Sequence, residues 1–110
     1  MADLTIKQQL ANVLAAHQEW IKSEGKTGVL LDLSEADLTS AVLIGADLTR
    51  ADMDSANLSK VCLWDADLID ASLVGANLTD ADLTEAKLNG VDFTEANFAN
   101  ADLKNATGLD

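Results

Sequence analysis

A large apolar residue stands at every fifth position from Leu33 to Leu103, without one insertion. A small residue, usually Ala, stands two places before it, and the other positions are mostly polar. This period fits neither the 3.6-residue repeat of an α-helix nor the alternation of a half-buried strand. The pattern therefore predicts a chain that turns a corner every five residues. Each unit points one large and one small side chain inward, and four units close a coil.

The individual units resemble the pentapeptide repeat family. They include ADLTS, ADLTR, ADMDS, ANLSK, ADLID, ANLTD and ADLTE, and the resemblance covers about residues 31 to 107. It implies an all-β solenoid, a right-handed quadrilateral β-helix of nearly four coils filled by the central Leu or Phe and the preceding Ala. Asp or Asn before the central residue suits tight turns, because its side chain can bond nearby backbone amides.

The N-terminal segment has a different period. Apolar residues and one histidine fall on one face at helical spacing: Ile6, Leu10, Val13, Leu14, His17, Trp20 and Ile21. We expect a helix from Asp3 to Ser23, ended by Gly25 and Gly28. An uncovered β-helix end exposes backbone groups and core side chains, so the expected role of this helix is a cap. Residues 1–30 would then be capping helix and linker, and residues 31–110 the β-helix.

Charge and cysteine content narrow the class of protein. The net charge is −12, all of it on residues 31–110, and a polyanion repels phosphate, so direct nucleic-acid binding is not expected. The chain has no apolar run long enough for a membrane span and no basic stretch leading into an apolar core, so we expect no membrane span and no signal peptide. The single cysteine, Cys62, excludes an internal disulfide and favours a reducing, cytoplasmic location.

Candidate catalytic chemistry is missing from the sequence. It contains one histidine, no nucleophile–base pair and no Gly-rich phosphate loop, so we expect neither an enzyme nor a bound cofactor. His17 on the apolar helix face is expected to be a packed residue rather than a ligand. Outward carboxylates on a regular stack do not converge, so no metal site is expected.

Two units break the rule that outward positions are polar. Val42 and Ile44 stand one full coil before Cys62 and Trp64, so each should stack on its counterpart. Outward apolar residues on the next sides, Ile69 and Val74, extend this candidate protein-binding patch. Three alternatives remain for it: the N-terminal helix covers it, a two-fold partner presents the same patch, or another protein docks there with Trp64 as anchor.

The C-terminal end also departs from the repeat. Phe93 and Phe98 replace Leu, and Gly108 occupies the next central place, so the repeat stops there. This end is either a dimer interface or is covered by Leu109.

The sequence thus favours a non-catalytic protein-interaction or structural scaffold that binds another protein or itself. The alternative, implied by the family resemblance, is an acidic DNA mimic that binds a type II topoisomerase such as gyrase. The chain differs from such mimics, because its central residues are mostly Leu and no dimerisation helix follows.

Overall fold

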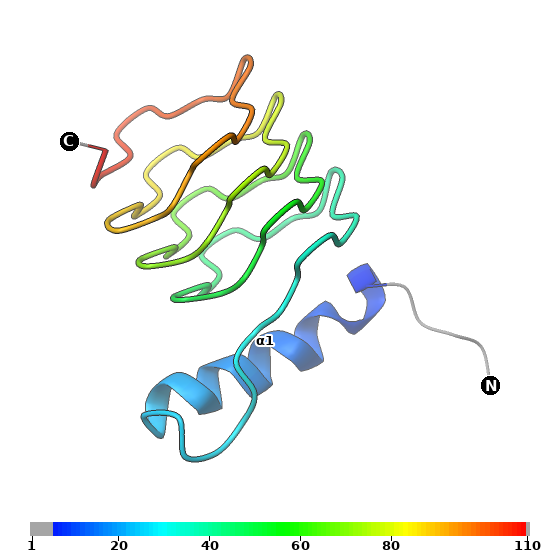
Figure 1. Cartoon of the computed structure of the whole chain (residues 1–110), viewed down its shortest axis with the longest axis vertical. Coiled ribbons are helices and arrows are strands. Elements are labelled where there is room, and N and C mark those ends of the chain that lie inside the picture. The colour runs from blue at the N-terminus through cyan, green and yellow to red at the C-terminus, as the bar shows by residue number, and fades with distance from the viewer. Residues whose placement is uncertain (1–5, 110) are drawn as a thin grey trace.

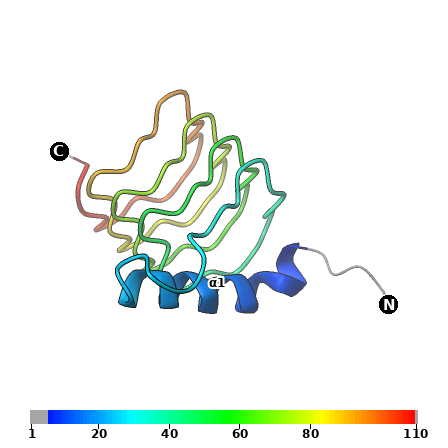
Figure 2. The ribbon, with the colours of Figure 1, turned by 60° about the horizontal axis from the view of Figure 1, so that its bottom comes forward.

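The computed structural model describes residues 6–109, with side chains from Leu10 onward. One helix, α1 (Ile6–Lys22), is followed by a linker and a stack of coils. Figure 1 shows α1 lying across one end of the stack, with the C-terminal residues at the opposite end. The view in Figure 2 shows the same helix running beneath the coils rather than along their side.

Neighbouring coils are joined by parallel bridges between residues twenty apart. The first is Asp32 with Asp52 and the last Lys87 with Thr107. We call residues 31–50, 51–70, 71–90 and 91–109 coils 1 to 4. Each bridge is a single residue, and residues 6–109 form no longer strand. Typical bonds are Leu33 N–H to the Asp52 carbonyl (2.7 Å) and Asp52 N–H to the Leu31 carbonyl (3.0 Å).

The corners explain why five residues form one unit. Every last residue of a unit, from Glu35 to Asn105, has a positive φ, close to +60° where it is not glycine. The N–H of the following residue donates to the carbonyl of the central one, as Ala36 does to Leu33 at 3.1 Å. A left-handed third residue closed by such a bond is the geometry of a type II turn. The Asp before the centre locks it, because its Oδ1 accepts the N–H two residues later, as Asp32 does from Ser34 at 2.9 Å.

Four walls result, one for each residue in the first set of bridges. We name them the Asp32, Asp37, Val42 and Asp47 walls, each continued by the residues twenty, forty and sixty places later. The inward Leu and Ala side chains of coils 1 to 3 are buried, with Ala36 and Ala46 partly so, whereas those of coil 4 are only partly buried. The core is therefore closed at the α1 end and open at the other.

Helix α1 closes its end of the core with side chains. Leu10 is buried against the inward residues of coil 1, and Val13 and Leu14 pack partly buried beside it. His17 is fully buried; its Nδ1 accepts the Leu31 N–H at 3.0 Å, and its ring stacks on Trp20. The predicted packed role of His17 is confirmed. The backbone amide of Leu31, at the start of coil 1, is thus satisfied by the helix.

Helix α1 ends at Lys22, one residue before the predicted end at Ser23. Glu24 (φ 58°) and the expected Gly25 (φ 85°) both have a positive φ, and Gly25 N–H donates to the Trp20 carbonyl at 2.8 Å. This is a Schellman-type end. At the other end, the expected residues Asp3 to Thr5 lie outside the described residues.

Gly28 lets the linker cross α1 at close range. The next residue, Val29, donates its N–H to the Ala16 carbonyl at 3.1 Å. A Cβ on Gly28 would overlap that carbonyl oxygen and lie 2.6 Å from the backbone nitrogen of Trp20. Its φ of +80° also disfavours other residues. Gly28 therefore fixes how the cap sits on the solenoid.

Candidate protein-binding surface

The Val42 wall brings together four of the six predicted patch residues. Val42 pairs with Cys62 in a parallel bridge, and Gly45 N–H donates to the Trp64 carbonyl at 2.8 Å, which aligns Ile44 with Trp64. The exposed fractions are 68% for Val42, 56% for Ile44 and 41% for Trp64, and Cys62 is half-buried. We call these four residues the Trp64 patch.

Ile69 and Val74 lie outside this patch. Val74 belongs to the Asp32 wall, two walls away, where its N–H donates to Asp54 Oδ1 at 3.0 Å. Ile69 belongs to the neighbouring Asp47 wall and lines a cleft with Trp20 and Ile21. The expectation of one contiguous patch of six residues therefore fails for these two, because consecutive units of the sequence occupy different walls.

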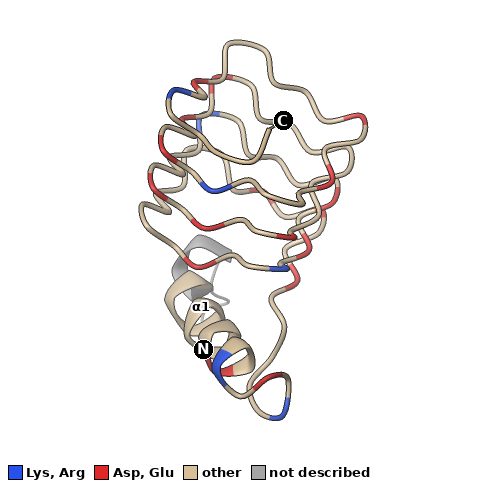
Figure 3. Cartoon of the chain, turned by 90° about the vertical axis from the view of Figure 1, so that its left-hand side faces the viewer, with Lys and Arg blue, Asp and Glu red and all other residues tan. Residues whose placement is uncertain are grey.

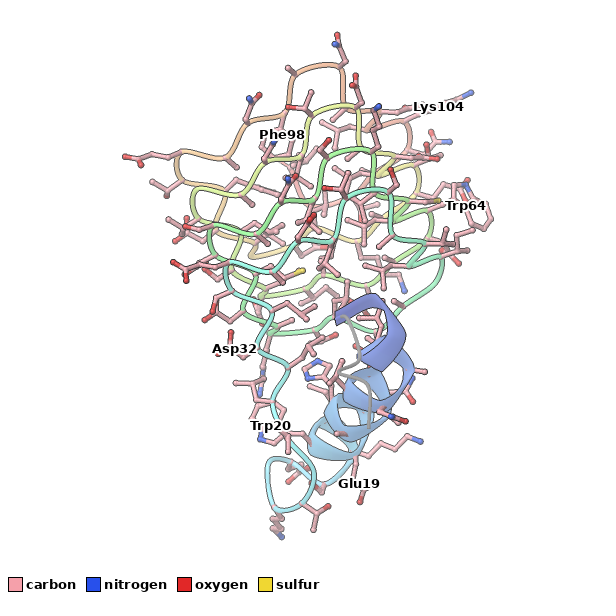
Figure 4. The ribbon with its side chains drawn as sticks, turned by 90° about the vertical axis from the view of Figure 1, so that its right-hand side faces the viewer. Glu19, Trp20, Asp32, Trp64, Phe98 and Lys104 are labelled. Carbon is pink, nitrogen blue, oxygen red and sulfur yellow. The ribbon has the colours of Figure 1, made fainter. Side chains whose placement is uncertain are left out.

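Helix α1 does not cover the Trp64 patch. It packs on the end of coil 1 and not on the Val42 wall (Figures 1 and 2). Figure 4 shows Trp64 projecting outward from the coils, on the same side as Lys104, while Trp20 lies down beside the helix. Of the three alternatives, coverage by the N-terminal helix is thus wrong for the Trp64 patch.

The surroundings of the patch are polar. Above it on the same wall stand Asp82, Thr84 and then Asp102. Both aspartates accept the backbone N–H two residues on, at 2.9 and 3.0 Å, so each is engaged in its own corner. The bridge partners of Cys62 are Val42 and Asp82, and neither is a cation that would stabilise a thiolate. Cys62 therefore acts as a small apolar member of the patch.

The acidic side chains gather on the opposite wall. The Asp32 wall carries six acids and no Lys or Arg: Asp32, Glu35, Asp52, Asp54, Asp92 and Glu95. Figure 3 shows acidic positions repeated up the solenoid, with few basic ones between them. The Trp64 patch and the wall with the most acids thus lie on opposite sides of the solenoid.

Hydrogen bonds hold two of these carboxyl groups in the ionised form. The Ser34 hydroxyl and N–H both donate to Asp32 Oδ1, and they lower the pKa of that carboxyl. The hydroxyl and N–H of Thr94 lower the pKa of Asp92 in the same way. Both bonds form within one corner, so these shifts report turn geometry rather than a reactive site.

Two hollows flank α1, and sequence reasoning did not find them. One, of about 560 Å³, lies between the C-terminal end of the helix and the Asp47 wall; its lining includes Trp20, Arg50 and Ile69. The other, of about 290 Å³, lies between the helix and the linker, where Val29 and Leu30 are exposed. Both depend on how the linker places the helix, for which the repeat gives no signal. Within residues 6–109, no three His, Cys, Asp or Glu side chains converge as metal ligands.

Two comparisons place the chain among known proteins, and a third does not. The family model for pentapeptide repeats matches residues 32–68, 63–100 and 76–107. A comparison with curated proteins found no match. Across the described residues, no helix is both long and apolar enough to cross a membrane.

Several solved structures share the fold. A pentapeptide repeat protein from the Arabidopsis thaliana thylakoid lumen is 35% identical, with a TM-score of 0.70 over 73% of this chain and 55% of its own. Rfr23 from the cyanobacterium Cyanothece 51142 is 36% identical, with a TM-score of 0.67 over 69% of this chain and 52% of its own. A third, from Nostoc PCC 7120, is 29% identical, with a TM-score of 0.70 over 84% of this chain and 71% of its own.

This chain thus spans about half the length of the first two of these proteins. All three are pentapeptide repeat proteins, and the likeness extends over most of the coils described above. The chain belongs to the pentapeptide repeat family, and its solenoid is the right-handed β-helix of that family, preceded by a helix.

Proposed function

We propose that this protein is a non-catalytic interaction scaffold whose Trp64 patch binds another protein. The observation that carries the proposal is the exposure of Val42, Ile44 and Trp64 on one wall, where the outward residues of the next two coils are polar. A contiguous apolar patch with a polar rim is typical of a protein-interaction site. The fold by itself says nothing about the partner, because function depends on sites carried by the fold.

The structure of the patch suits a rigid docking surface. Cys62 and Trp64 are bonded through their backbone to coil 1, and Val42 pairs with Cys62 in a parallel bridge, so binding costs little ordering of this backbone. Trp is enriched among the residues that anchor interfaces, and the Trp64 side chain is 41% exposed. Full burial of Val42 or Ile44 would contribute about 1.5–3 kcal/mol each, before the costs of association.

The residues around the patch suggest what kind of protein surface could bind there, and Cys62 bears on the cellular compartment. An apolar patch beside Asp65 and Asp82 fits a protein with an apolar pocket and a basic or neutral rim. We place the protein in the cytoplasm on the strength of its single unpaired thiol at Cys62. Among the described residues, the one histidine is buried in the cap contact, where its Nδ1 accepts a backbone N–H.

Site-specific photocrosslinking in cells tests this proposal. A crosslinking residue at Ile44 should capture a distinct protein, and adding Trp64→Glu should abolish that product. The matched control places the crosslinker at Thr84, which occupies the same place on the wall one coil beyond Trp64. The proposal fails if the Ile44 product persists with Trp64→Glu in a chain whose circular dichroism is unchanged, or if it consists only of a second copy of this chain.

The Asp32 wall favours a second candidate function, binding to a type II topoisomerase as an acidic DNA mimic. Six acids without a base lie there on coils 1, 2 and 4, which makes this wall negatively charged. DNA supercoiling by gyrase should then fall when the protein is added, and Asp52→Asn with Asp54→Asn should restore it. Unchanged supercoiling at high micromolar protein would exclude this candidate.

A further inference from the structure

The larger of the two hollows beside α1 has the size and lining of a small-molecule site. It measures about 560 Å³, and such sites typically measure about 300–1,000 Å³. Its half-buried apolar lining consists of Trp20 and Ile21 from the end of α1 and Ile69 from the Asp47 wall. We call this hollow the Arg50 cleft, after the one cation among its lining residues. An apolar group of a ligand can therefore be buried between the helix and the wall.

Two opposite charges line the Arg50 cleft from its two sides. Arg50 stands at the corner that ends the Asp47 wall of coil 1, and Glu24 stands just after the end of α1. Both side chains are exposed, and neither forms an ion pair with another described residue. An unpaired guanidinium suits a carboxylate, because its planar fork of N–H donors matches the two oxygens. The cleft therefore offers one place for an anion and one for a cation.

The neighbouring acid at the same corner does not neutralise Arg50. Asp70 stands one coil further along, and the Arg50 N–H donates to the Ile69 carbonyl at 2.9 Å, so the two corners lie one strand spacing apart, roughly 4.8 Å. A Cβ on Gly90 would overlap Asp70 Oδ1, so this carboxylate is turned toward coil 3. The Arg50 guanidinium thus has no carboxylate partner on its own wall.

Coil 1 also leaves a backbone acceptor at this cleft. In coil 2, the equivalent carbonyl, that of Ile69, accepts the N–H of Arg50 from the coil below. Coil 1 has α1 instead of a coil beneath it, and the Thr49 carbonyl accepts no hydrogen bond from the described residues. The Thr49 hydroxyl makes no such bond either, whereas those of Thr79 and Thr94 donate to their own corners at 2.6 Å. Thr49 therefore adds two unused polar groups to the lining.

We propose that the Arg50 cleft binds a free α-amino acid with an apolar side chain. The carboxylate of the ligand pairs with Arg50, its ammonium group with Glu24 and the Thr49 carbonyl, and its side chain packs on Trp20 and Ile69. A zwitterion satisfies both unpaired charges at once, whereas an anion or a cation alone would leave one of them without a partner. Because a zwitterion has no net charge, the net charge of −12 on the chain does not repel it.

A second corner of the solenoid shows that the charges alone do not make such a site. Lys60 ends a unit on the Asp37 wall, and Asp80 stands one coil further along at the same corner. This pair repeats the arrangement of Arg50 and Asp70, but Lys60 lines neither of the two hollows beside α1. Lys60 is therefore the matched control for Arg50.

An NMR titration of the full 110-residue chain with L-leucine, and separately with L-phenylalanine, tests the proposal. The amides of Thr49, Arg50 and Ile69 should shift and saturate, while that of Val42 in the Trp64 patch should not. Arg50→Gln and Glu24→Gln should each weaken the affinity about ten-fold or more, because each removes a charged hydrogen-bond partner. Lys60→Gln should leave the affinity unchanged.

Ligand analogues test each charge without altering the protein. Leucinamide lacks the carboxylate and N-acetyl-L-leucine lacks the ammonium group, so each should bind about ten-fold or more weakly than L-leucine. Glycine lacks the apolar side chain and should also bind more weakly. This ligand site is independent of the proposed docking function, so Trp64→Glu should bind L-leucine as the wild type does.

Three results would overturn the proposal. One is that neither L-leucine nor L-phenylalanine shifts the amides of the cleft at millimolar concentration. Another is a folded Arg50→Gln chain that binds as tightly as the wild type. The third is N-acetyl-L-leucine binding as tightly as L-leucine, which would identify the carboxyl end of a peptide as the ligand instead. Should a variant fail to fold, the comparison of analogues on the wild type decides alone.

Discussion

The two ends of the solenoid are built from the same repeat, yet one is closed and the other open. At the first end, Leu38 and its counterparts in coil 1 are buried beneath Leu10 and the buried ring of His17. At the second, Phe98 and its counterparts in coil 4 remain partly exposed, and the coil edge lacks a partner within the described chain. Sequence repetition therefore builds the interior but does not terminate it.

The closed end shows how a helix terminates a β stack. A helix has no free backbone groups along its side, so α1 offers coil 1 mainly side chains. One of these side chains, His17, accepts the Leu31 N–H through Nδ1, and its Nε2 is buried without a partner among the described residues. The cap therefore excludes water from the core without continuing the hydrogen-bond ladder. At the opposite end, the corresponding groups of coil 4 have no partner among residues 6–109.

The largest expected effect comes from truncating a central residue in the closed interior. Leu78→Ala removes a fully buried side chain between two coils and should lower the free energy of unfolding by about 2–5 kcal/mol. Leu103→Ala in coil 4 should cost less than about 2 kcal/mol, since solvent already reaches that site. Urea unfolding in dilute solution measures both. Equal losses would mean that coil 4 is as well buried as the interior.

The period of five predicted the interior correctly because it reflects local geometry. Each corner is closed by hydrogen bonds within a few residues, such as the bond from Ala36 N–H to the Leu33 carbonyl. The sequence of a single unit is therefore enough to predict its corner. The helix was also predicted correctly, because the spacing of its apolar residues is a property of that segment alone. The positive φ of Glu24 was not predicted, whereas Gly25, which was expected to end the helix, does have a positive φ.

The candidate patch was only partly predictable for the same reason. Residues twenty apart were placed correctly, and the bridge from Val42 to Cys62 is observed. Val74 was misplaced, because adjacency between walls depends on the coil geometry and not on distance along the chain. The position of α1 relative to the walls could not be predicted from the sequence either. It depends on the linker crossing at Gly28, a close contact between residues far apart in the sequence.

An intermediate effect is expected where the cap is attached. Gly28→Ala should lower the free energy of unfolding by about 2–3 kcal/mol, because φ of +80° is strained for alanine and the Cβ overlaps the helix backbone. The matched control is Gly45→Ala, at a corner with φ of +67° and open space around it, with an expected loss of about 1 kcal/mol.

Urea unfolding compares these two variants, and the fluorescence of Trp20 reports the cap directly. A Gly28→Ala loss no larger than that of Gly45→Ala would show that the linker can move away from α1 without cost. The closed end would then depend on the side chains of the helix alone.

The smallest expected effect tests whether the two ends share their turn chemistry. The pKa of Asp32, in the capped coil, and of Asp92, in the open one, both lie below the ordinary value of 3.8, chiefly because a hydroxyl donates to each carboxylate. A lowered pKa in the folded state means that the stabilisation is present above pH 3.8 and is lost as the pH falls through the folded value.

Asp32→Asn and Asp92→Asn should each remove a similar small part of this acid sensitivity. Asparagine keeps the acceptor oxygen, as Asn77 shows by accepting the Thr79 hydroxyl at 2.6 Å, but it does not titrate. Urea midpoints at neutral pH and below pH 3 give the effect, and an NMR titration gives the two pKa values. If the pKa of Asp92 were normal and only that of Asp32 lowered, the cap would stabilise the corners beneath it. Equal pKa shifts for Asp32 and Asp92 would instead mean that the two ends differ only in core burial and in the pairing of the coil edge.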